Sequence, residues 1–551
     1  MKTRRNGFLI MKNMLNLVGN LYPIMVMAVL IGSLGHLCAS FVTILAGYGL
    51  VSIITHQDFY FIIKLILALA VLRGIFHYIE QYLNHFLAFK ILAQIRHLVF
   101  KKMRSLGPAK LCTKEKGKLI SLITSDIELL EVFYAHTISP IAIALVYMIF
   151  MLVFISHFTI YQAILAFLAY TSIGLIVPLA IARLNKDLGL LSRNKTGELN
   201  SFVLERIRNI YEVKQFDLKK KSEDELIEKS RNLKQIDLKI NQIKSLQEGL
   251  TTGLILSSSL LMFALSAYLY EKRIVGFDGI IIPTLAILSS FGPFVALSNL
   301  GNFLAFTLAS ADRILDLLAE KPLVKEVLGE GQLGSFDQGQ IKNVSFAYKD
   351  EPIIKDFSLT IDRGKILGLY GKSGCGKSTI LRLIMRFWDV NKGKITINNK
   401  DIKDLASADL RKAESLLGQD TYIFNLSIEE NIRLAKLDAT KEEIINAAKK
   451  ASIHDFIESL PKSYATMAGE IGSGLSAGER QRIGVARAFL HDADLMLFDE
   501  PTSNLDILNE VIILKSIKES SKDKTILLVS HSLSSLSIAD EKIRVGNTRK
   551  S

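Results

Sequence analysis

The 551-residue sequence is poor in cysteine and contains no internal repeat and no low-complexity tract. Its three cysteines, Cys38, Cys112 and Cys375, are too few and too scattered for a disulfide framework. Cys38 lies in an apolar run, Cys112 in a basic segment and Cys375 in a glycine-rich one, so we expect the last two to face a reducing cytoplasm. No protease, nuclease or metal-cluster constellation stands out.

Apolar residues, by contrast, are abundant and unevenly distributed. They make up 49% of the chain, the mean hydropathy is +0.30, and the excess lies before about residue 310. Runs of this length can cross a hydrocarbon layer of roughly 30 Å. We therefore predict six membrane spans, at about Leu21–Ile54, Phe59–Phe86, Ser139–Ser156, Thr159–Ala182, Gly249–Tyr270 and Val275–Thr307.

Positive charge is concentrated between the predicted spans. The formal net charge is +13, and the long segments after the second and fourth spans, residues 90–118 and 183–244, are strongly basic. Lysine and arginine in loops favour the cytoplasmic side of a membrane. We therefore expect a multi-pass protein of the cytoplasmic membrane whose long loops and both termini lie in the cytoplasm. This distribution accounts for the basic charge without nucleic acid as a partner.

The composition changes after Arg313. Residues 321–340 carry glycine and charge without a long apolar run, as a linker does. From Ile341 onward, short β-branched runs alternate with amphipathic helical patterns. We predict a transmembrane domain over residues 1–320, a linker over 321–340 and a soluble α/β domain over 341–551.

A glycine-rich motif, GKSGCGKST, follows the strand-like run KILGLY and opens a helix-like run. This is the context of a P-loop, whose backbone N–H groups wrap the phosphates of a nucleotide. Lys377 would neutralise the β- and γ-phosphates, and the Ser378 hydroxyl would ligate Mg²⁺. The predicted ATP-binding residues of the loop are Gly371, Ser373, Gly374, Cys375, Gly376, Lys377, Ser378 and Thr379.

Two adjacent carboxylates follow another strand-like run. In DADLMLFDEP, four apolar residues lead directly to Asp499 and Glu500. A buried strand that ends in two carboxylates suits nucleotide hydrolysis, because Asp499 can hold Mg²⁺ while Glu500 polarises the attacking water.

Further motifs surround these two in a fixed order. They are VSFAYKD with Tyr348, LLGQDTYIF with Gln419, GLSAGE with Leu475–Glu479, and His531 after TILLVS. Together with the P-loop they resemble the ATPase domain of ABC exporters over its whole length. The resemblance implies ATP and Mg²⁺ as cofactors and ATP hydrolysis coupled to transport. It further implies that Tyr348 stacks on adenine, that Gln419 senses and binds Mg²⁺ as part of catalysis, and that His531 contacts the γ-phosphate.

The segment GLSAGE departs from the family's usual LSGGQ signature at Ala477 and Glu479. In this family two ATPase domains meet head to tail, and each signature loop closes on the ATP held by the partner. The resemblance implies that Leu475, Ser476, Ala477, Gly478 and Glu479 act on the partner's nucleotide. Because Ser476 and Gly478 retain the hydrogen-bond donors, we expect the two departures to have a modest effect.

Six spans and one ATPase domain make half of a transporter, so the resemblance implies a dimer in the lipid bilayer. The predicted fold is an all-α six-helix transmembrane domain of the exporter (type IV) kind, followed by an α/β P-loop ABC ATPase domain. Short helices near Leu119–Asp126 and Arg208–Phe216, at the tips of the long loops, would dock on the ATPase domains.

A polar stripe interrupts the second span. In RGIFHYIEQYLNH, several polar residues fall on one face at helical spacing: Arg73, His77, Glu80 or Gln81, and Asn84. Ionisable residues within a span are costly and usually face the bundle interior or a cavity. This stripe is the predicted cargo site.

The same segment resembles the CydC-like subunit of the cytochrome bd assembly (CydDC-type) half-transporters. Tyr78, Glu80 and His85 match that subunit's pattern, whereas His77 and Gln81 replace arginines. The resemblance implies a heterodimer and a cargo related to thiols or to haem, with His85 and His77 as axial haem ligands. The cargo or haem candidates are Arg73, His77, Glu80 and His85.

Other functions remain open at this stage. A general exporter of drugs, peptides or lipids, or an importer of haem or siderophores, could share the fold, because fold fixes neither cargo nor direction. A subunit of another class would bind ATP for regulation and hydrolyse little of it, although Glu500 and His531 argue against that. The six spans exclude a DNA-repair ATPase of the same superfamily.

Overall fold

The computed structural model describes residue 5 and residues 7–54, 59–113, 116–300, 304–329, 333–348, 351–469, 472, 474–503, 505–520 and 523–546. Its contacts divide the chain into two compact units. The first comprises residues 1–102 and 114–320, and the second comprises residues 103–113 and 321–551. The short segment 103–113, which lies within the predicted transmembrane domain, thus groups with the second unit.

The first unit is built of helices. Among the residues described, six helical segments are long and apolar enough to cross a membrane, as predicted from the sequence. They are Gly19–Ile54, Tyr60–Leu106, Leu119–Ser156, Ile160–Asn185, Lys219–Glu271 and Asp278–Leu300. Several extend well beyond their apolar runs, because charged residues continue the helical pattern at one end.

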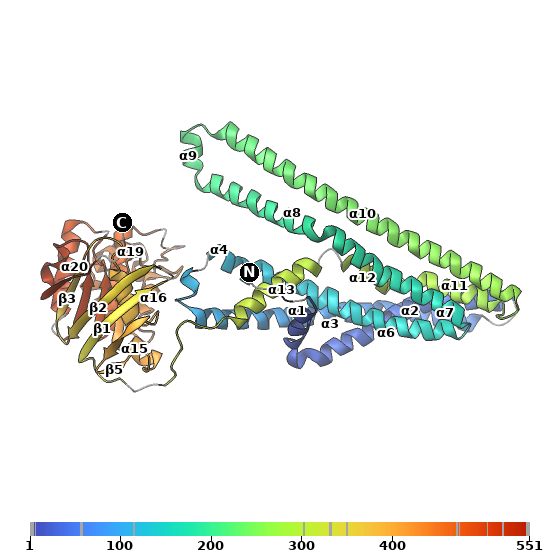
Figure 1. Ribbon diagram of the computed structural model, residues 1–551, viewed down its shortest axis with the longest axis horizontal. Helices are drawn as coiled ribbons and strands as arrows, with labels where there is room; N and C mark the ends of the chain where they lie inside the picture. Colours follow the sequence, from blue (N-terminus) through green and yellow to red (C-terminus); the bar gives the residue numbers. More distant parts are fainter. Residues whose placement is uncertain are drawn as a thin grey trace. The chain divides into compact units, whose positions relative to one another are not determined.

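The main helices of this unit can be followed in Figure 1. They are α1 (Gly7–Asn16), α2 (Tyr22–Ile54), α3 (Tyr60–Leu106), α4 (Lys116–Ser121), α5 (Ile127–Phe133), α6 (Ser139–Ser156), α7 (Ile160–Thr171), α8 (Val177–Arg208), α9 (Ile210–Gln215), α10 (Lys219–Glu271), α11 (Asp278–Ser289), α12 (Gly292–Leu300) and α13 (Leu304–Ala319).

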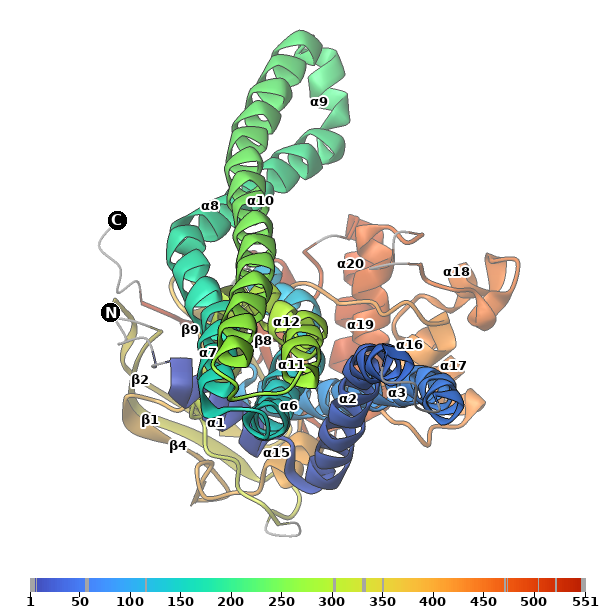
Figure 2. The same cartoon turned by 90° about the vertical axis from the view of Figure 1, so that its right-hand side faces the viewer.

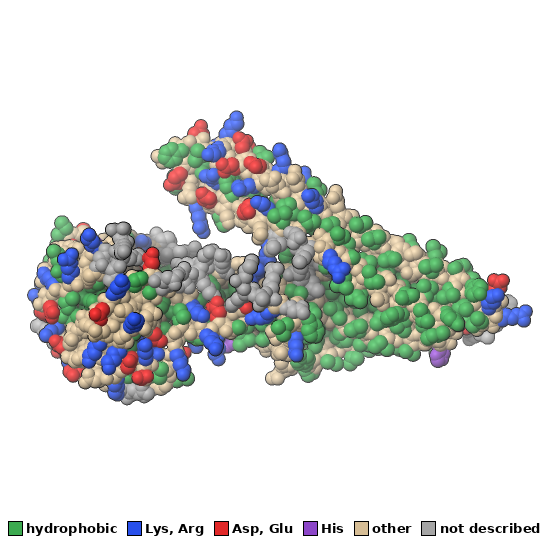
Figure 3. Space-filling view, viewed as in Figure 1, with side chains coloured by type: hydrophobic (Ala, Val, Ile, Leu, Met, Phe, Trp, Pro, Cys, Tyr) green, Lys and Arg blue, Asp and Glu red, His purple; other side chains and the backbone are tan. Residues whose placement is uncertain are grey.

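The long helices α8 and α10 lie side by side, with α9 at their common end (Figure 1). The Ser192 hydroxyl donates a hydrogen bond to Asp237 Oδ1 at 2.8 Å between them. Figure 3 shows acidic and basic side chains gathered near this end, whereas apolar side chains cover the spans. The helix predicted near Arg208–Phe216 is present as α9.

The helix predicted at the tip of the first long loop is misplaced. Leu119–Asp126 lies inside the third spanning segment, where a π-helical stretch, Leu122–Asp126, joins α4 to α5. The loop itself is the segment 103–113, whose Ala109 packs in the core of the second unit. Helical periodicity continues through residues 119–126, whereas Gly107–Pro108, a dipeptide that marks turns, stands directly after the end of α3 and is the signal that the sequence analysis missed.

Asp126 fixes the last helix of the first unit. Its carboxylate is buried and accepts hydrogen bonds from Arg313 Nε at 2.7 Å and from Ser310 Oγ at 3.1 Å, both in α13. Arg193 of α8 lies 3.4 Å from the same carboxylate. Three helices therefore meet at one buried anion.

The second unit contains two sheets. A four-stranded antiparallel sheet has the order β2-β1-β4-β5, and a five-stranded parallel sheet has the order β6-β7-β8-β3-β9. The strands are β1 (Gln338–Ala347), β2 (Pro352–Asp362), β3 (Ile366–Tyr370), β4 (Lys392–Ile397), β5 (Lys400–Asp401), β6 (Glu414–Leu417), β7 (Leu495–Asp499), β8 (Thr525–Val529) and β9 (Glu541–Arg544). β1 begins at Gln338, inside the range predicted as linker.

Helices complete this α/β unit. They are α14 (Lys377–Ile384), α15 (Ser407–Ala413), α16 (Ile428–Arg433), α17 (Lys441–Lys450), α18 (His454–Ser459), α19 (Ala477–His491) and α20 (Ile507–Ser520). Figure 2 shows β1, β2 and β4 on one side of the unit and α16, α17 and α18 on the opposite side. The predicted succession of a helical transmembrane domain and an α/β domain is confirmed.

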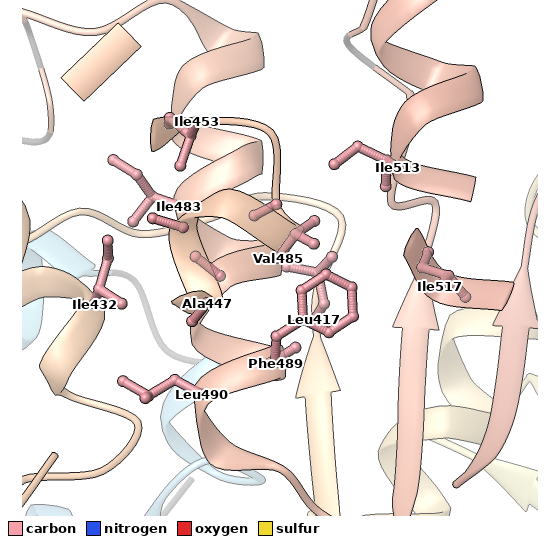
Figure 4. Packing of buried hydrophobic residues seen from close by; sticks show 14 of the residues in the cluster. Leu417, Ile432, Ala447, Ile453, Ile483, Val485, Phe489, Leu490, Ile513 and Ile517 are labelled. Carbon is pink, nitrogen blue, oxygen red and sulfur yellow. The ribbon is translucent and has the colours of Figure 1, made fainter. Parts of the chain in front are cut away.

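Helix α19 organises the core between these helices and the parallel sheet. Its residues Ile483, Val485 and Phe489 are buried in one apolar cluster with Leu417 of β6 and Ile513 of α20 (Figure 4). Burial of such side chains stabilises a fold by roughly 1.5–3 kcal/mol each. The core therefore links α19 to the strands that carry the candidate site.

Candidate functional site

The predicted P-loop lies between β3 and α14. Gly374 and Gly376 have φ values of 79° and 100°, a region that side chains with a Cβ rarely adopt. A Cβ on Gly376 would also lie 3.0 Å from Ile353 Cγ2. The Lys377 ammonium donates a hydrogen bond to the Gly371 carbonyl at 2.9 Å, so this loop holds its own lysine in place.

The Ser378 hydroxyl and the Asp499 carboxylate meet at the carboxyl end of the parallel sheet. Ser378 Oγ donates to Asp499 Oδ1 at 2.9 Å, although the two residues are 121 positions apart. Burial raises the pKa of Asp499, and the hydrogen bond from Ser378 opposes that shift. A hydroxyl and a carboxylate are the oxygen ligands that Mg²⁺ accepts beside a nucleotide, so the pair fits that ion.

Of the three predicted catalytic residues, Gln419 and His531 both approach the carboxylate of the third, Glu500. Gln419 Nε2 donates to Glu500 Oε2 at 3.3 Å, and His531 Nδ1 lies 3.3 Å from Glu500 Oε1. Glu500 adopts φ = 52°, in the left-handed region that costs a residue with a side chain of order 1–3 kcal/mol. The turn after β7 therefore directs the carboxylate of Glu500 to the side chains that follow β6 and β8.

Tyr348 follows β1 beside the P-loop helix. Its hydroxyl lies 3.4 Å from Thr379 Oγ1, and its ring packs edge-on against Trp388, with centroids 5.1 Å apart. Trp388 did not figure in the sequence analysis. Its contact holds the tyrosine ring beside the phosphate loop.

The signature segment forms the start of α19. Ser476 is the N-cap: its Oγ accepts a hydrogen bond from the Glu479 N–H at 3.3 Å, and its own N–H donates to Glu479 Oε2 at 2.7 Å. This reciprocal pair is a capping box, which glutamate and glutamine both support. Ala477 is the first helical residue, where glycine offers no advantage. Leu475 is buried beneath the turn, and Gly478 lies within the helix.

Two residues of α19 that the sequence analysis missed connect this helix to the predicted catalytic residue Glu500 and to the segment after Gln419. Gln481 is buried, and its Nε2 donates to the Glu500 carbonyl at 3.4 Å. Arg487 Nη1 donates to the Tyr422 carbonyl at 2.7 Å, in the segment after Gln419. The available signal was weak: a glutamine stands at an apolar position of an amphipathic helix.

A separate polar cavity lies in the first unit. Its volume is about 490 Å³, and it is lined by residues of α2, α3, α5, α6 and α12 and of the π-helical segment Tyr134–Ile138. The lining includes the predicted His77 and Glu80. Its main polar residues are His36, His77, Glu80, Gln81, Asn84 and His136.

The other two cargo candidates lie outside the described lining of this cavity. Arg73 is exposed on α3, one turn before His77. His85 Nδ1 lies 3.2 Å from Glu131 Oε1, and its ring packs against His136 with centroids 5.4 Å apart. Within the described part of the chain, no three His, Cys, Asp or Glu side chains are grouped so as to hold a metal ion.

Comparison with known proteins gives consistent results for both units. Residues 354–503 match the ABC transporter family, and residues 21–294 match the ABC transporter transmembrane region. A Haemophilus influenzae protein, named as a probable ABC transporter ATP-binding/permease protein, is 43% identical over 554 residues, covering 100% of each chain. A Staphylococcus aureus protein, named as a multidrug export ATP-binding/permease protein, is 30% identical over 486 residues, or 87% of this chain and 83% of that one.

The fold is also found among solved structures. A bacterial Atm1-family ABC exporter with ATP bound superposes with a TM-score of 0.82 at 22% identity, covering 95% of this chain and 92% of that one.

Proposed function

This chain belongs to the ABC transporter family and couples ATP hydrolysis to transport, and we propose that it is one half of a dimeric exporter of small organic molecules. The observation that carries the proposal is the meeting of Gln419 and His531 at Glu500, beside the Ser378–Asp499 pair. A subunit that only binds ATP would not need this arrangement.

In the proposed mechanism, the P-loop residues Gly371–Thr379 wrap the phosphates and Tyr348 supports the adenine ring. When ATP binds, the Lys377 ammonium would exchange its hydrogen bond to the Gly371 carbonyl for contacts with the β- and γ-phosphates, because its attraction to their negative charge is stronger. Mg²⁺, held by Ser378, Gln419 and Asp499, would neutralise the phosphate charge.

Glu500 would orient the attacking water and accept its proton, while His531 contacts the γ-phosphate. The Gln419 amide and the His531 ring hold the carboxylate before ATP arrives, which reduces the reorganisation needed at the reaction step.

The signature segment would act in trans. ABC exporters work as dimers within a membrane, and in the proposed assembly the N-terminus of α19 and Ser476 meet the γ-phosphate held by the partner's P-loop. Gln481 of α19 also donates a hydrogen bond to the backbone carbonyl of Glu500. A contact between α19 and the partner's ATP would therefore affect the position of this chain's own proposed catalytic residue.

The proposed direction is export from the cytoplasm. The S. aureus relative is named for multidrug export, and the basic loops favour the cytoplasm for the ATPase domain and both termini. The charged ends of α8 and α10 agree with that orientation.

A second candidate is the CydC-like function, in which the chain forms a heterodimer and moves a haem- or thiol-related cargo. The observation that favours it is the pairing of His85 Nδ1 with Glu131 Oε1 at 3.2 Å. Iron-ligating histidines commonly have a carboxylate on one ring nitrogen and use the other as the ligand. A haem absorption band that survives His85→Ala in the purified protein would rule out this ligand.

The test of the ATP-driven function is Glu500→Gln in the full chain reconstituted in lipid nanodiscs. Loss of a general base should lower ATP turnover about 10²-fold or more. Glu519→Gln, which alters an exposed carboxylate of α20, is the matched control and should keep wild-type turnover. Equal turnover in Glu500→Gln and wild type would favour the regulatory subunit.

A further inference from the structure

We infer that the polar cavity of the first unit binds the ammonium group of an amphiphilic organic amine. The inference rests on the proposed export function and names the class of its cargo. It is carried by two hydrogen-bond acceptors on one wall of the cavity, Glu80 and Asn84, which the described residues leave poorly satisfied.

Glu80 is deeply buried although it lies in a spanning segment. Only 6% of the surface of Glu80 is exposed. Helix α2 approaches this residue so closely that a Cβ on Gly32 would lie 3.0 Å from Glu80 Cδ. Its nearest described polar partner is His77 Nδ1 at 3.5 Å, beyond a good hydrogen bond. A carboxylate in such a place is costly unless it is paired with a cation.

Asn84 adds a second acceptor one turn further along α3. The residue is 3% exposed and lines the cavity, and its Oδ1 accepts no hydrogen bond from any residue that the structure describes. Residues four apart share a helix face. A single N–H-rich group could therefore reach both the Glu80 carboxylate and the Asn84 carbonyl.

The remaining lining suits a cation with an apolar body. No lysine or arginine occurs among the described lining residues, and the histidine rings add further ring nitrogens to the lining. Val132, Ile143, Ala296 and Leu300 supply apolar contacts on the other walls. The volume of about 490 Å³ lies within the range of small-molecule sites, roughly 300–1,000 Å³.

The experiment compares tryptamine with tryptophol, which carries a hydroxyl in place of the ammonium group. Binding of each to the full-length dimer in lipid nanodiscs is measured by isothermal titration calorimetry, for wild type, Glu80→Gln and Asn84→Asp. The control is Asp278→Asn, which makes the same carboxylate-to-amide change in the first turn of α11, outside the cavity lining.

The expected result has three parts. Wild type binds tryptamine more tightly than tryptophol, and Glu80→Gln weakens tryptamine binding about tenfold or more without weakening tryptophol, since a hydrogen bond to a charged group is lost. Asn84→Asp strengthens tryptamine binding, a gain that damaged folding would not produce. Asp278→Asn matches wild type.

Equal affinity of wild type for the two compounds, or no binding of either, would overturn the inference, as would unchanged tryptamine binding in both cavity variants. Such a result would leave the ATP-driven function intact if Glu500→Gln still abolishes turnover. Loss of the proposed function would instead appear as turnover that does not depend on Glu500.

Discussion

Ser476 and Glu479 exchange two hydrogen bonds at the first turn of α19: the Ser476 N–H donates to the glutamate at 2.7 Å, and the Glu479 N–H donates to the serine hydroxyl at 3.3 Å. The departures of GLSAGE from the usual signature thus have local structural explanations. Glutamate completes a capping box, and alanine is a better helix former than glycine. The same serine is the proposed contact with the partner's ATP. In the cap its oxygen accepts a hydrogen bond, so its O–H can still donate to the partner's γ-phosphate.

Glu479→Ala is expected to lower the stability of the second unit by about 1 kcal/mol, because the capping box is lost. The stability of Glu479→Gln should differ from that of wild type by only a few tenths of a kcal/mol, because glutamine also supports a capping box. Stability can be read from Trp388, the chain's single tryptophan, which is buried in this unit's core. Equal thermal midpoints for Glu479→Ala and Glu479→Gln would show that the cap contributes nothing.

Gly32→Ala is expected to displace Glu80 and weaken binding of tryptamine. A Cβ at Gly32 would lie 2.5 Å from Ile143 Cδ1 and 3.0 Å from two atoms of Glu80, so these side chains must move. Gly74→Ala is the matched control in α3, since its Cβ would meet no described atom within 4 Å. The measurement is the tryptamine titration, and equal affinities of the two variants would contradict the packing explanation.

The buried carboxylate of Glu414 predicts a pH dependence of stability. Burial raises the pKa of Glu414 to about 8, against the opposing charge of Arg411 at 3.8 Å, and neither carboxylate oxygen has a hydrogen-bond partner among the described residues. Between about pH 4.5 and pH 8 the folded chain therefore holds a proton that the unfolded chain releases. Stability falls as pH rises through this window, by up to about 1.4 kcal/mol per pH unit.

Glu414→Gln removes this titration. The variant should match wild type near pH 4.5 and become progressively more stable than wild type toward pH 8, as read from the thermal transition of Trp388. Glu519→Gln, an exposed carboxylate, controls for the change in net charge. A constant difference between Glu414→Gln and wild type across the range would refute the buried-proton account.

The Asp126–Arg313 contact predicts an energetic coupling between α13 and the start of α5. Asp126→Asn should cost about 1–3 kcal/mol, less than a fully buried pair would, because Arg313 is half exposed. In a double-mutant cycle with Arg313→Gln, the two changes should be non-additive by about 1 kcal/mol. Maleimide modification of the buried Cys38 during heating, read by peptide mass spectrometry, reports unfolding of this unit. If the stability losses of the two single variants simply add in the double variant, the contact between Asp126 and Arg313 does not contribute to stability.

The sequence predicted those parts of the fold that depend on local pattern. Spans follow from long apolar runs, and the P-loop follows from glycines at fixed spacing between a strand and a helix pattern. The turn after Leu106 was predicted in the wrong place, because the helical pattern on both sides of it outweighed Gly107–Pro108, a local signal that ends a helix. Only tertiary contact decides that the segment 103–113 groups with the second unit. Gln481 and Arg487 escaped for a related reason: their partners lie 19 and 65 positions away.

The sequence by itself determined the two kinds of domain and led to the proposed ATP-site residues, because each is encoded in a contiguous stretch that leads directly into regular structure. Tertiary structure alone decided which of the polar residues in the second span share a cavity. His77, Glu80 and Asn84 line it, whereas Arg73 and His85 do not, although helical spacing had placed Arg73 on the same face. The difference arises because a cavity is defined by the neighbouring helices: Gly32 of α2 and Ile143 of α6 enclose Glu80, and no spacing within one helix records where those neighbours lie.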